Sequence, residues 1–512
     1  MTSTVTPSAA PTDSTVQFRT KRKASAISTV MSKALFDKEA KYAGAWIIGL
    51  TILEKNPGLD RLRELLRERL VSKYVRFRSQ LVINEKGEAE FHELDVADID
   101  YESYHVPDLS ELTSAKPWSR NELFEYLAKL NEFEYDLSRP LWRYLLIPNL
   151  ENGEAAIISS ISHAIGDGLA LIEVLEGLYD KPPSEQGIKH TGKKMPSSKF
   201  DFLTKLGIFL YGIYHGLSIP LARPDPPNKL RLKKGVKPLG KKLIASAQPI
   251  DLERVKEIKN KMEGTTINDV LMGLMTMTLK SFFTEEEPEN FKKNQRVTAQ
   301  FPISMRGLGE GGLDAFGEPH NKISYAYFDF HFDGSRTDII WDTKFQIDCI
   351  KISPSPVVVG FSAKLINNLL PTQLMLNLTR DAANLGSAQL SNVPAPQGQV
   401  SLLGVKVVDM SFFLFSPLAC YLGILTYNNK VVASFNLDSG LGVDPKILAK
   451  HWSKEFEELY KEVMSKEGVL TPPKFDIEFY KKVSIGTIGT IVAFISLIIL
   501  RMLVLFILSK LR

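Results

Sequence analysis

The chain has 512 residues, of which 44% are hydrophobic and 24% charged, and its formal net charge is +4 at pH 7. This length and composition fit a folded protein with two domains of ordinary size and additional segments. The nearly balanced charge gives no support for nucleic-acid binding. Two cysteines and eight scattered histidines offer neither a disulfide framework nor metal-ligand spacing, so no metal site is expected.

Residues 1–37 have the composition of a disordered tail. Thirteen of the first 35 residues are Ser or Thr, Asp13 is the one acid among them, and a basic cluster occupies 21–23. The segment lacks the apolar core of a secretory signal peptide. We therefore expect a plain cytosolic tail, with an organelle-import peptide of similar composition as the alternative.

A mixed α/β domain is predicted for 38–190. Apolar runs alternate with segments in which leucines share one helical face and charges occupy the other. The predicted elements are strands over 45–53, 142–147 and 155–161 and helices over 59–70 and 121–131.

The stretch SHAIGDG at 162–168 joins the last of these strands to an apolar helix that starts at Leu169. His163 therefore lies on a short turn at the end of a buried strand. A rigid scaffold holds such a side chain still, which is what a catalytic base requires. From local structure alone the alternative is that Asp167 caps the helix and His163 is an ordinary turn residue.

Residues 191–242 are predicted to form a crossover between domains. Its apolar part, 206–222, contains three glycines and Pro220, so it makes a poor membrane span. It fits an interfacial or channel-lining helix and a packed crossover helix equally well. The following part, 223–242, carries eight Lys and Arg against one acid, Asp225. This is typical of a solvated linker, but it also suits anionic lipid headgroups or other phosphates.

A second α/β domain is predicted for 243–470. Amphipathic helices are expected over 251–263 and 445–464, and Thr266 and Asp269 have the spacing of a capping box that opens another helix. The predicted strands are 300–304, 322–332, 412–415, 419–427 and 430–436.

The most apolar segment is 483–508. It has no charge from Val483 to Leu500, and after Arg501 it is apolar again. That length suffices to cross a hydrocarbon core of about 30 Å. With no signal sequence ahead of it, we expect a single-pass C-terminal membrane anchor that leaves the rest of the chain facing the cytosol.

Six short motifs, taken in order, resemble those of the bifunctional wax ester synthase/diacylglycerol acyltransferases, a family within the condensation-domain superfamily of CoA-dependent acyltransferases. SHAIGDG is similar to the family's HHxxxDG motif, with Ser162 in place of the first histidine and His163 as the second. The others are FRSQLV at 77–82, RPLW at 139–142, NDVL at 268–271, PISMR at 302–306 and SNVPAP at 391–396.

This resemblance implies an α/β fold of two chloramphenicol-acetyltransferase-like sandwich domains, with His163 midway along a tunnel between them. It also implies an O-acyltransferase that moves a fatty acyl group from acyl-CoA to a long-chain alcohol or diacylglycerol, forming wax esters or triacylglycerol. Acyl-CoA is then a co-substrate, and no cofactor is expected. Because the acceptors partition into bilayers, we expect membrane lipid as a partner and the endoplasmic reticulum as the location.

In this scheme His163 is the general base, because a neutral imidazole takes the alcohol proton and returns it to the departing sulfur. Asp167 is expected to pair with Arg306 or Arg78 and so to fix the loop, and Gly168 to permit a close backbone approach. Asn268 is expected to reach the site as an oxyanion donor or positioning group. The other residues expected to bind substrate or support the site are Ser162, Asp269, Ser391 and Asn392.

Two other functions remain open on the sequence. A relative with a different acceptor, such as a plant-type HxxxD acyltransferase, would carry DFGWG near the C-terminus, but the nearest match here is an early, incomplete DAFG at 314–317. An inactive lipid-binding relative is disfavoured because His163, Asp167, Asn268 and Arg306 are retained. Turnover of acyl-CoA by the purified protein separates this last reading from both enzyme readings.

Overall fold

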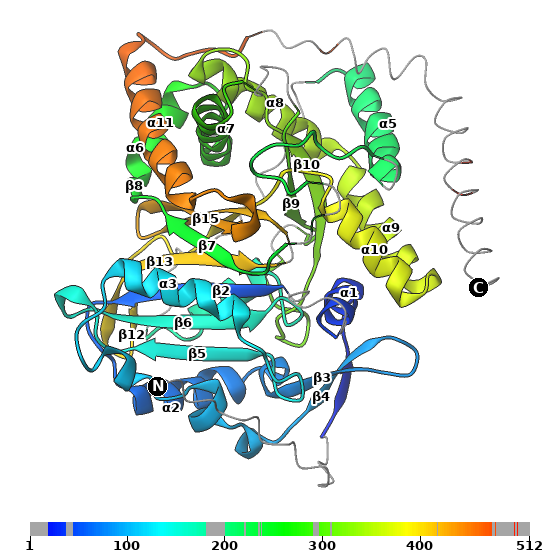
Figure 1. Cartoon of the computed structure of the whole chain (residues 1–512). Helices are drawn as coiled ribbons and strands as arrows, with labels where there is room; N and C mark the ends of the chain where they lie inside the picture. Colours follow the sequence, from blue (N-terminus) through cyan, green and yellow to red (C-terminus); the bar gives the residue numbers. More distant parts are fainter. Residues whose placement is uncertain are drawn as a thin grey trace.

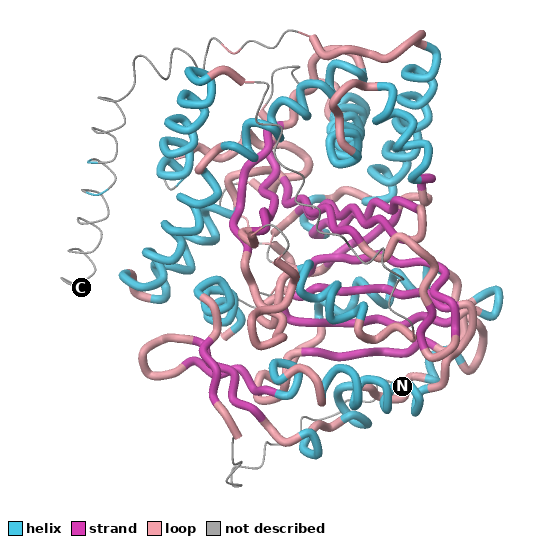
Figure 2. The backbone as a smooth tube through the Cα atoms, turned by 180° about the vertical axis from the view of Figure 1, so that it is seen from behind, coloured by secondary structure: helices cyan, strands magenta, loops and turns pink. Residues whose placement is uncertain are grey.

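The computed structural model describes residues 19–36, 45–180, 200–219, 222–233, 238–289, 296–307, 310–416 and 418–473, together with positions 236, 477, 496 and 499. Two large β-sheets form the centre of this part of the chain, and helices surround them (Figures 1 and 2). The membrane segment expected at 483–508 lies outside the described residues, apart from two of those isolated positions.

The first sheet has five strands in the order β12-β13-β2-β6-β5. β2 pairs with β6 along its whole length, and β6 pairs with β5 on its other side. β6 is therefore an inner strand whose position is fixed from both edges. The N-terminal half supplies these elements: β2 (Trp46–Leu53), α2 (Leu59–Leu66), α3 (Arg120–Lys129), β5 (Trp142–Ile147), β6 (Ala155–Ser162) and α4 (Gly168–Glu176).

The other two strands of this sheet come from the second half of the chain, which the predicted division at 38–190 and 243–470 did not anticipate. β12 (Ser401–Leu402) pairs with β13 (Val405–Phe415), and β13 pairs antiparallel with β2 from Val407–Leu53 to Phe415–Trp46. An apolar run predicts a strand but not its partner. The two halves are consequently joined by backbone hydrogen bonds as well as by packing.

The second sheet has seven strands, in the order β10-β9-β11-β14-β15-β7, with β8 beside β15. β14 is buried along its entire length and β15 along nearly all of it, which agrees with the mostly apolar sequence of both strands. The strands are β7 (Lys242–Ser246), β8 (Ile250–Asp251), β9 (Thr298–Ser304), β10 (Ile323–Asp329), β11 (Ala388–Pro394), β14 (Cys420–Tyr427) and β15 (Lys430–Asp438).

Helices gather beside this sheet, with α7 at their centre (Figure 1). The capping box predicted for α7 is confirmed: Asp269 N donates to Thr266 Oγ1 at 3.2 Å, and Thr266 N donates to Asp269 Oδ2 at 2.8 Å. The helices around α7 are α6 (Leu252–Lys261), α8 (Arg336–Ile352) and α11 (Pro445–Ser465), and α7 itself spans Ile267–Glu286.

Three further helices lie on the other side of β10: α5 (Phe202–Ser218), α9 (Ser355–Leu369) and α10 (Thr372–Ala383) (Figure 1). α5 packs closely on α9, since a Cβ at Gly216 would lie 2.9 Å from Cβ of Val358. Gly212 and Gly216 of this apolar segment are thus packing residues. Within the described residues no single helix is long and apolar enough to cross a bilayer, although α8 and α9, bent by 55°, satisfy the length and composition criteria as a pair.

The basic crossover segment, 223–242, is held in place by Asp225, its one acidic residue. Asp225 is 2% exposed, and its carboxylate accepts hydrogen bonds from Thr298 N at 2.7 Å and Ser387 Oγ at 2.7 Å. Lys242, at the end of the run, is also buried and donates from Nζ to the carbonyl of Leu418 at 2.7 Å. These two contacts attach the crossover to the second sheet, so it is not a free linker at these positions.

The predicted disordered tail is wrong for residues 19–36. Strand β1 (Lys21–Lys23) joins β4 (Ala89–Glu93) and β3 (Ser79–Ile83) in a small sheet, and helix α1 (Ala26–Leu35) follows. Ser25 caps α1 by accepting from Ser28 N at 3.1 Å. Three of the Ser and Thr residues that suggested disorder, Ser28, Thr29 and Ser32, are buried in this helix.

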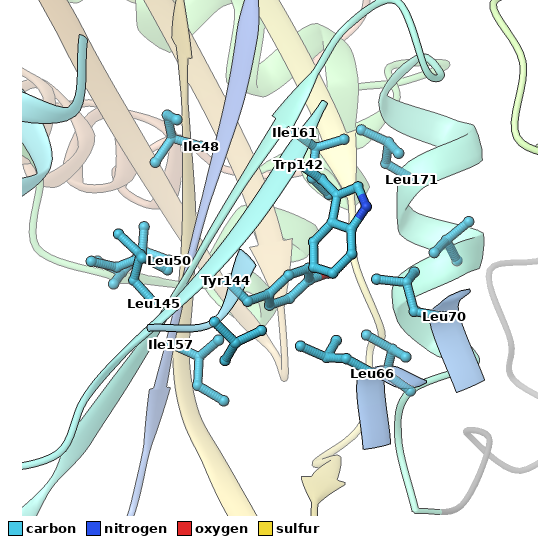
Figure 3. Packing of buried hydrophobic residues seen from close by; sticks show 14 of the residues in the cluster. Ile48, Leu50, Leu66, Leu70, Trp142, Tyr144, Leu145, Ile157, Ile161 and Leu171 are labelled. Carbon is cyan, nitrogen blue, oxygen red and sulfur yellow. The ribbon is translucent and has the colours of Figure 1, made fainter. Parts of the chain in front are cut away.

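The two sheets have separate hydrophobic cores. In the first core, Trp142 and Tyr144 of β5 lie between the sheet and Leu66, Leu70 and Leu171 (Figure 3). The Trp142 indole donates to the carbonyl of Phe77 at 2.6 Å, so a residue of RPLW is tied to a residue of FRSQLV. Both motifs therefore serve the packing beneath the turn that carries His163.

Candidate active site

His163 follows β6 directly, and the period of that strand decides which side chains face which way. Ser159, Ile161 and His163 line one cavity, whereas Ser160 and Ser162 do not. Alternate residues of a strand point to opposite faces. The backbone here is held by neighbours on both sides, since His163 N donates to the carbonyl of Ala45 at 2.8 Å and Ser162 N to that of Leu141 at 2.9 Å.

The cavity has a volume of about 810 Å³ and is lined by both halves of the chain. This lies within the range of roughly 300–1,000 Å³ that ligand sites occupy. β2, β6 and α4 contribute from the first half, β9, β10, β11, α9 and α10 from the second, and α1 from the N-terminal segment. The lining is mostly apolar, and His163 is the one titratable imidazole that faces it among the described residues.

The imidazole of His163 is held by Asn321, in the loop just before β10. His163 Nδ1 lies 3.2 Å from Asn321 Oδ1, and Asn321 Nδ2 donates to the carbonyl of His163 at 2.7 Å. Desolvation in the cavity lowers the pKa of His163, while its own carbonyl, Asp167 and Asn321 oppose that shift. Burial thus favours the neutral form of the ring, and Nδ1 is engaged by Asn321 while Nε2 is left for a substrate.

Asp167 does not contact the imidazole; it holds the turn, as expected. Its Oδ2 accepts from Arg306 Nη1 at 2.8 Å and from Lys322 N at 2.9 Å, and its Oδ1 caps α4 by accepting from Ala170 N at 3.1 Å. Arg78, the other candidate partner, pairs instead with Glu93 at 2.9 Å.

The arginine also orders the opposite segment. Arg306 Nη2 donates to the carbonyls of Gly312 and His320, each at 3.0 Å. The Asp167–Arg306 pair thus joins the turn that bears His163 to the segment that bears Asn321. One buried ion pair, made from two of the predicted motifs, fixes the distance between His163 and Asn321.

Ser162 occupies the position of the family's first histidine, but it does not line the cavity. It is 2% exposed, and its Oγ accepts from Ala164 N at 3.3 Å. Strand alternation thus turns Ser162 away from the cavity, so its side chain is not placed to touch a substrate there.

The close approach expected at Gly168 occurs at Gly166. A Cβ at Gly166 would lie 3.1 Å from Cβ of Pro319, whereas one at Gly168 would make an ordinary 3.6 Å contact with Val393. Gly168 does line the cavity. Gly166, which faces the segment before Asn321, is thus the glycine whose missing side chain matters more.

Ser391 and Asn392 line the cavity from β11 because two strands of the second sheet separate there. β9 and β11 pair only at Ala388–Ala299 and Gln389–Gln300. β11 continues beside β14 as far as Pro394. The other edge of β11 is consequently not occupied by β9 beyond Gln389, and consecutive residues reach the cavity.

Asn268 and Asp269 lie behind this wall. Asn392 Nδ2 donates to Asn268 Oδ1 at 3.0 Å, so Asn268 supports a lining residue and is not itself part of the lining. Asp269 is fully buried in the capping box of α7, and desolvation raises its pKa. Among the described residues there is no cluster of His, Cys, Asp and Glu suited to a metal ion.

Two family models match the chain in the order of its halves. The wax ester synthase/diacylglycerol acyltransferase catalytic domain matches 40–221, and the C-terminal domain of the same family matches 320–460. The chain belongs to this family. The match covers the SHAIGDG turn in the first half and Asn321 in the second.

Named relatives agree with this assignment. Wax ester synthase/diacylglycerol acyltransferase 11 of Arabidopsis thaliana is 26% identical over 63% of this chain and 73% of its own length. Wax ester synthase/diacylglycerol acyltransferase 3 of the same plant is 24% identical over 73% of this chain and 82% of its own length.

Solved structures identify the fold. The wax ester synthase/diacylglycerol acyltransferase of Marinobacter aquaeolei VT8 superposes with a TM-score of 0.58 at 15% identity, covering 86% of this chain and all of that one. The first condensation domain of the calcium-dependent antibiotic synthetase reaches 0.58 at 14% identity, covering 88% of this chain and 99% of that one. The family's condensation-domain-like α/β fold is thus confirmed.

Two parts of the site were missed by the sequence analysis. Asn321 follows Pro319 and His320 in a loop that carries no recognised motif, and it lies 158 residues from His163. Helix α1 precedes the family match, and its signal was the helical spacing of Ile27, Val30 and Met31, which face the cavity.

Proposed function

We propose that this protein is an O-acyltransferase that moves a fatty acyl group from acyl-CoA to the hydroxyl of a long-chain alcohol or of diacylglycerol, with His163 as general base. The observation that carries the proposal is the position of the His163 imidazole, which faces a large apolar cavity while Asn321 holds its Nδ1. The names of the relatives supply the substrate class.

The reaction needs no covalent enzyme intermediate. Nε2 of His163 takes the hydroxyl proton as the alcohol oxygen attacks the thioester carbonyl carbon. The tetrahedral intermediate then expels the sulfur, which receives that proton from the imidazolium and leaves as coenzyme A thiol. Both substrates occupy the cavity together, and its apolar walls exclude the water that would otherwise hydrolyse the thioester.

The polar wall formed by β11 is suited to the developing oxyanion. Asn392 lines the cavity and is oriented by its hydrogen bond to Asn268. Preorganised donors of this kind stabilise the charge that appears on the carbonyl oxygen. In this proposal Asn268 therefore acts through Asn392 and does not contact the substrate, and Ser391 lines the wall beside them.

A membrane surface is the proposed source of the acceptor. α5 and α9 pack together and carry large apolar side chains in solvent, and both helices also line the cavity. Contiguous apolar surface of this kind marks a protein or membrane contact. The exposed residues are Phe202, Leu203, Phe209 and Tyr214 on α5 and Val357, Phe361, Leu365 and Leu369 on α9.

The apolar segment 483–508 is the proposed anchor that keeps this surface at the bilayer. Its composition suits a membrane span, and the alcohol and diacylglycerol substrates concentrate in the same phase. We place the protein at the endoplasmic reticulum with its catalytic part facing the cytosol.

The proposal is tested by expressing the full chain in a cell unable to make neutral lipid and feeding it a fatty alcohol. Accumulation of wax ester or triacylglycerol is the expected result, and it should disappear with His163→Ala. Absence of both esters, with the protein present at normal abundance in the membrane fraction, would contradict the proposal.

A further inference from the structure

The side-chain amide of Asn321 has a defined orientation. Nδ2 donates to the carbonyl of His163 at 2.7 Å and to Ser28 Oγ at 2.9 Å. A rotated amide would place its carbonyl oxygen against the carbonyl of His163, which offers no proton. Oδ1 therefore faces His163 Nδ1, 3.2 Å away.

This orientation selects one tautomer of the imidazole. Oδ1 accepts hydrogen bonds and does not donate them, so Nδ1 of His163 must carry the proton. Nε2 is then unprotonated and can act as base. A partner on one ring nitrogen fixes the proton on that nitrogen and the direction of the ring, as partners of metal-bound histidines do.

Ser28 belongs to helix α1, which precedes the part of the chain that the family model matches, 40–221. Ser28 is fully buried, and Asn321 is 4% exposed. The first turn of α1 is held in place by the Ser25 cap. α1 is also attached at its other end, where Lys33 Nζ donates to Asn367 Oδ1 of α9 at 3.2 Å.

We infer that Asn321 is a positioning residue for His163 and that the N-terminal helix α1, through Ser28, holds Asn321 in its working orientation. The N-terminal segment is then a component of the catalytic centre and not an appendage to it. This inference rests on the proposed function, since it assigns a role toward the base of that reaction.

Few charged or titratable groups surround His163. Asp167 is paired with Arg306, and His320 is next to Asn321 in the chain. Tyr325 faces the cavity from β10, and Arg76 donates to the carbonyl of Ile165 on the turn. Asn321 is uncharged, so replacing it with alanine removes a hydrogen bond to His163 without removing a charge.

The first test compares Asn321→Ala with Asn321→Asp in the full-length protein, using kcat, KM and the pH dependence of kcat/KM. Asn321→Ala should lower kcat by about 10–100-fold with KM for acyl-CoA within threefold, because the base loses its fixed tautomer. The acid limb of the kcat/KM profile of Asn321→Ala should move to lower pH, because the hydrogen bond that stabilises the His163 imidazolium is lost. Asn321→Asp should move that limb to higher pH, because a carboxylate stabilises the imidazolium.

Opposite shifts of the acid limb in the two variants support a role of Asn321 in positioning His163. If Asn321 were purely structural, the direction of the shift would not depend on the charge of the replacement. Unchanged kcat and an unchanged pH profile in folded Asn321→Ala would overturn the inference. If the Asn321 variants do not fold, the decision passes to Ser28.

The second test is a cycle of Ser28→Ala and Asn321→Ala, with Ser32→Ala as matched control. Ser32 is equally buried in α1, but its hydroxyl donates to the Ser28 carbonyl at 2.6 Å within the helix. Ser28→Ala should lower kcat about 3–10-fold, as expected when Asn321 loses its hydrogen bond to Ser28, and Ser32→Ala should keep kcat within twofold. Equal losses from both serine variants would overturn the role of Ser28.

In the Asn321→Ala background, Ser28→Ala should cause no further loss, because Ser28 acts through Asn321. If Ser28→Ala lowered kcat by the same factor in both backgrounds, Ser28 would not act through Asn321. Failure of the proposed function has a different signature: His163→Ala would then retain turnover. Loss of turnover in His163→Ala together with normal kinetics in Asn321→Ala would overturn this inference alone.

Discussion

The carboxylate of Asp167 lies 2.8 Å from Nη1 of Arg306, and the two side chains are only 2% and 3% exposed. The pair links the first turn of α4 to the segment after β9, so it connects the two halves of the chain at the site. Both residues belong to motifs that the sequence offered, but only the structure distinguishes Arg306 from Arg78 as the partner.

Asp167→Asn should lower both stability and turnover. The change leaves Arg306 buried without its counter-charge, which costs about 3 kcal/mol of the free energy of unfolding. Thermal unfolding and turnover are measured together, with Asp60→Asn as control because the Asp60 side chain is 94% exposed. Lost turnover with unchanged stability and a shifted pH profile would instead indicate a direct action of Asp167 on His163.

Ser162→His should not improve the enzyme, although it restores the family's usual pair of histidines. Ser162 is buried on the face of β6 that points away from the cavity. A larger side chain there overpacks the interior, at a cost of about 1–3 kcal/mol. Ser162→Ala should retain turnover within threefold. A loss above tenfold in Ser162→Ala at unchanged melting temperature would mean that this hydroxyl takes part in the chemistry.

Much of the site could be predicted because its residues lie in short motifs with a local meaning. A strand followed by a capped helix places His163 and Asp167 on one turn, and the spacing of Thr266 and Asp269 specifies a helix cap. Asp269 shows the limit of this reasoning: the motif marks the residue, but the structure places it in the cap and outside the cavity lining.

The remainder depends on contacts between distant parts of the chain. Asn321 has no local pattern, and its role follows from a contact across 158 residues. β13 has the pattern of a strand, but its pairing with β2 is set by tertiary structure. In α1, the many Ser and Thr residues obscured the helical spacing of Ile27, Val30 and Met31, which face the cavity.

Val30→Trp should reduce the length of either the acyl chain or the alcohol chain that the enzyme accepts. Val30 faces the cavity from α1, so a larger side chain there fills space that a substrate chain would use. Turnover is measured against acyl-CoA length and, separately, against alcohol length. One profile should shift to shorter chains, which identifies the substrate that runs along α1. Leu112→Trp, at an exposed site away from the cavity, is the control, and two unchanged profiles for Val30→Trp would exclude α1 from substrate contact.

Phe361→Glu should impair use of membrane-borne acceptors. The Phe361 side chain is 66% exposed on α9, and a charge there opposes insertion into lipid. Turnover with diacylglycerol in phosphatidylcholine vesicles should fall, whereas turnover with a short soluble alcohol should stay within twofold. Phe316→Glu is the matched control, since Phe316 is 82% exposed on a loop outside α5 and α9. Equal losses on both acceptors would argue against a membrane role for this surface.

The most direct test of the account is the turnover of acyl-CoA and alcohol by purified His163→Ala, compared with the unaltered protein at saturating substrates. A positioned general base contributes about 10²–10⁴-fold to the rate, so turnover should fall by that factor. The melting temperature should change little, because the side chain faces the cavity. Turnover within threefold of the unaltered protein would contradict the assignment of His163 as the base.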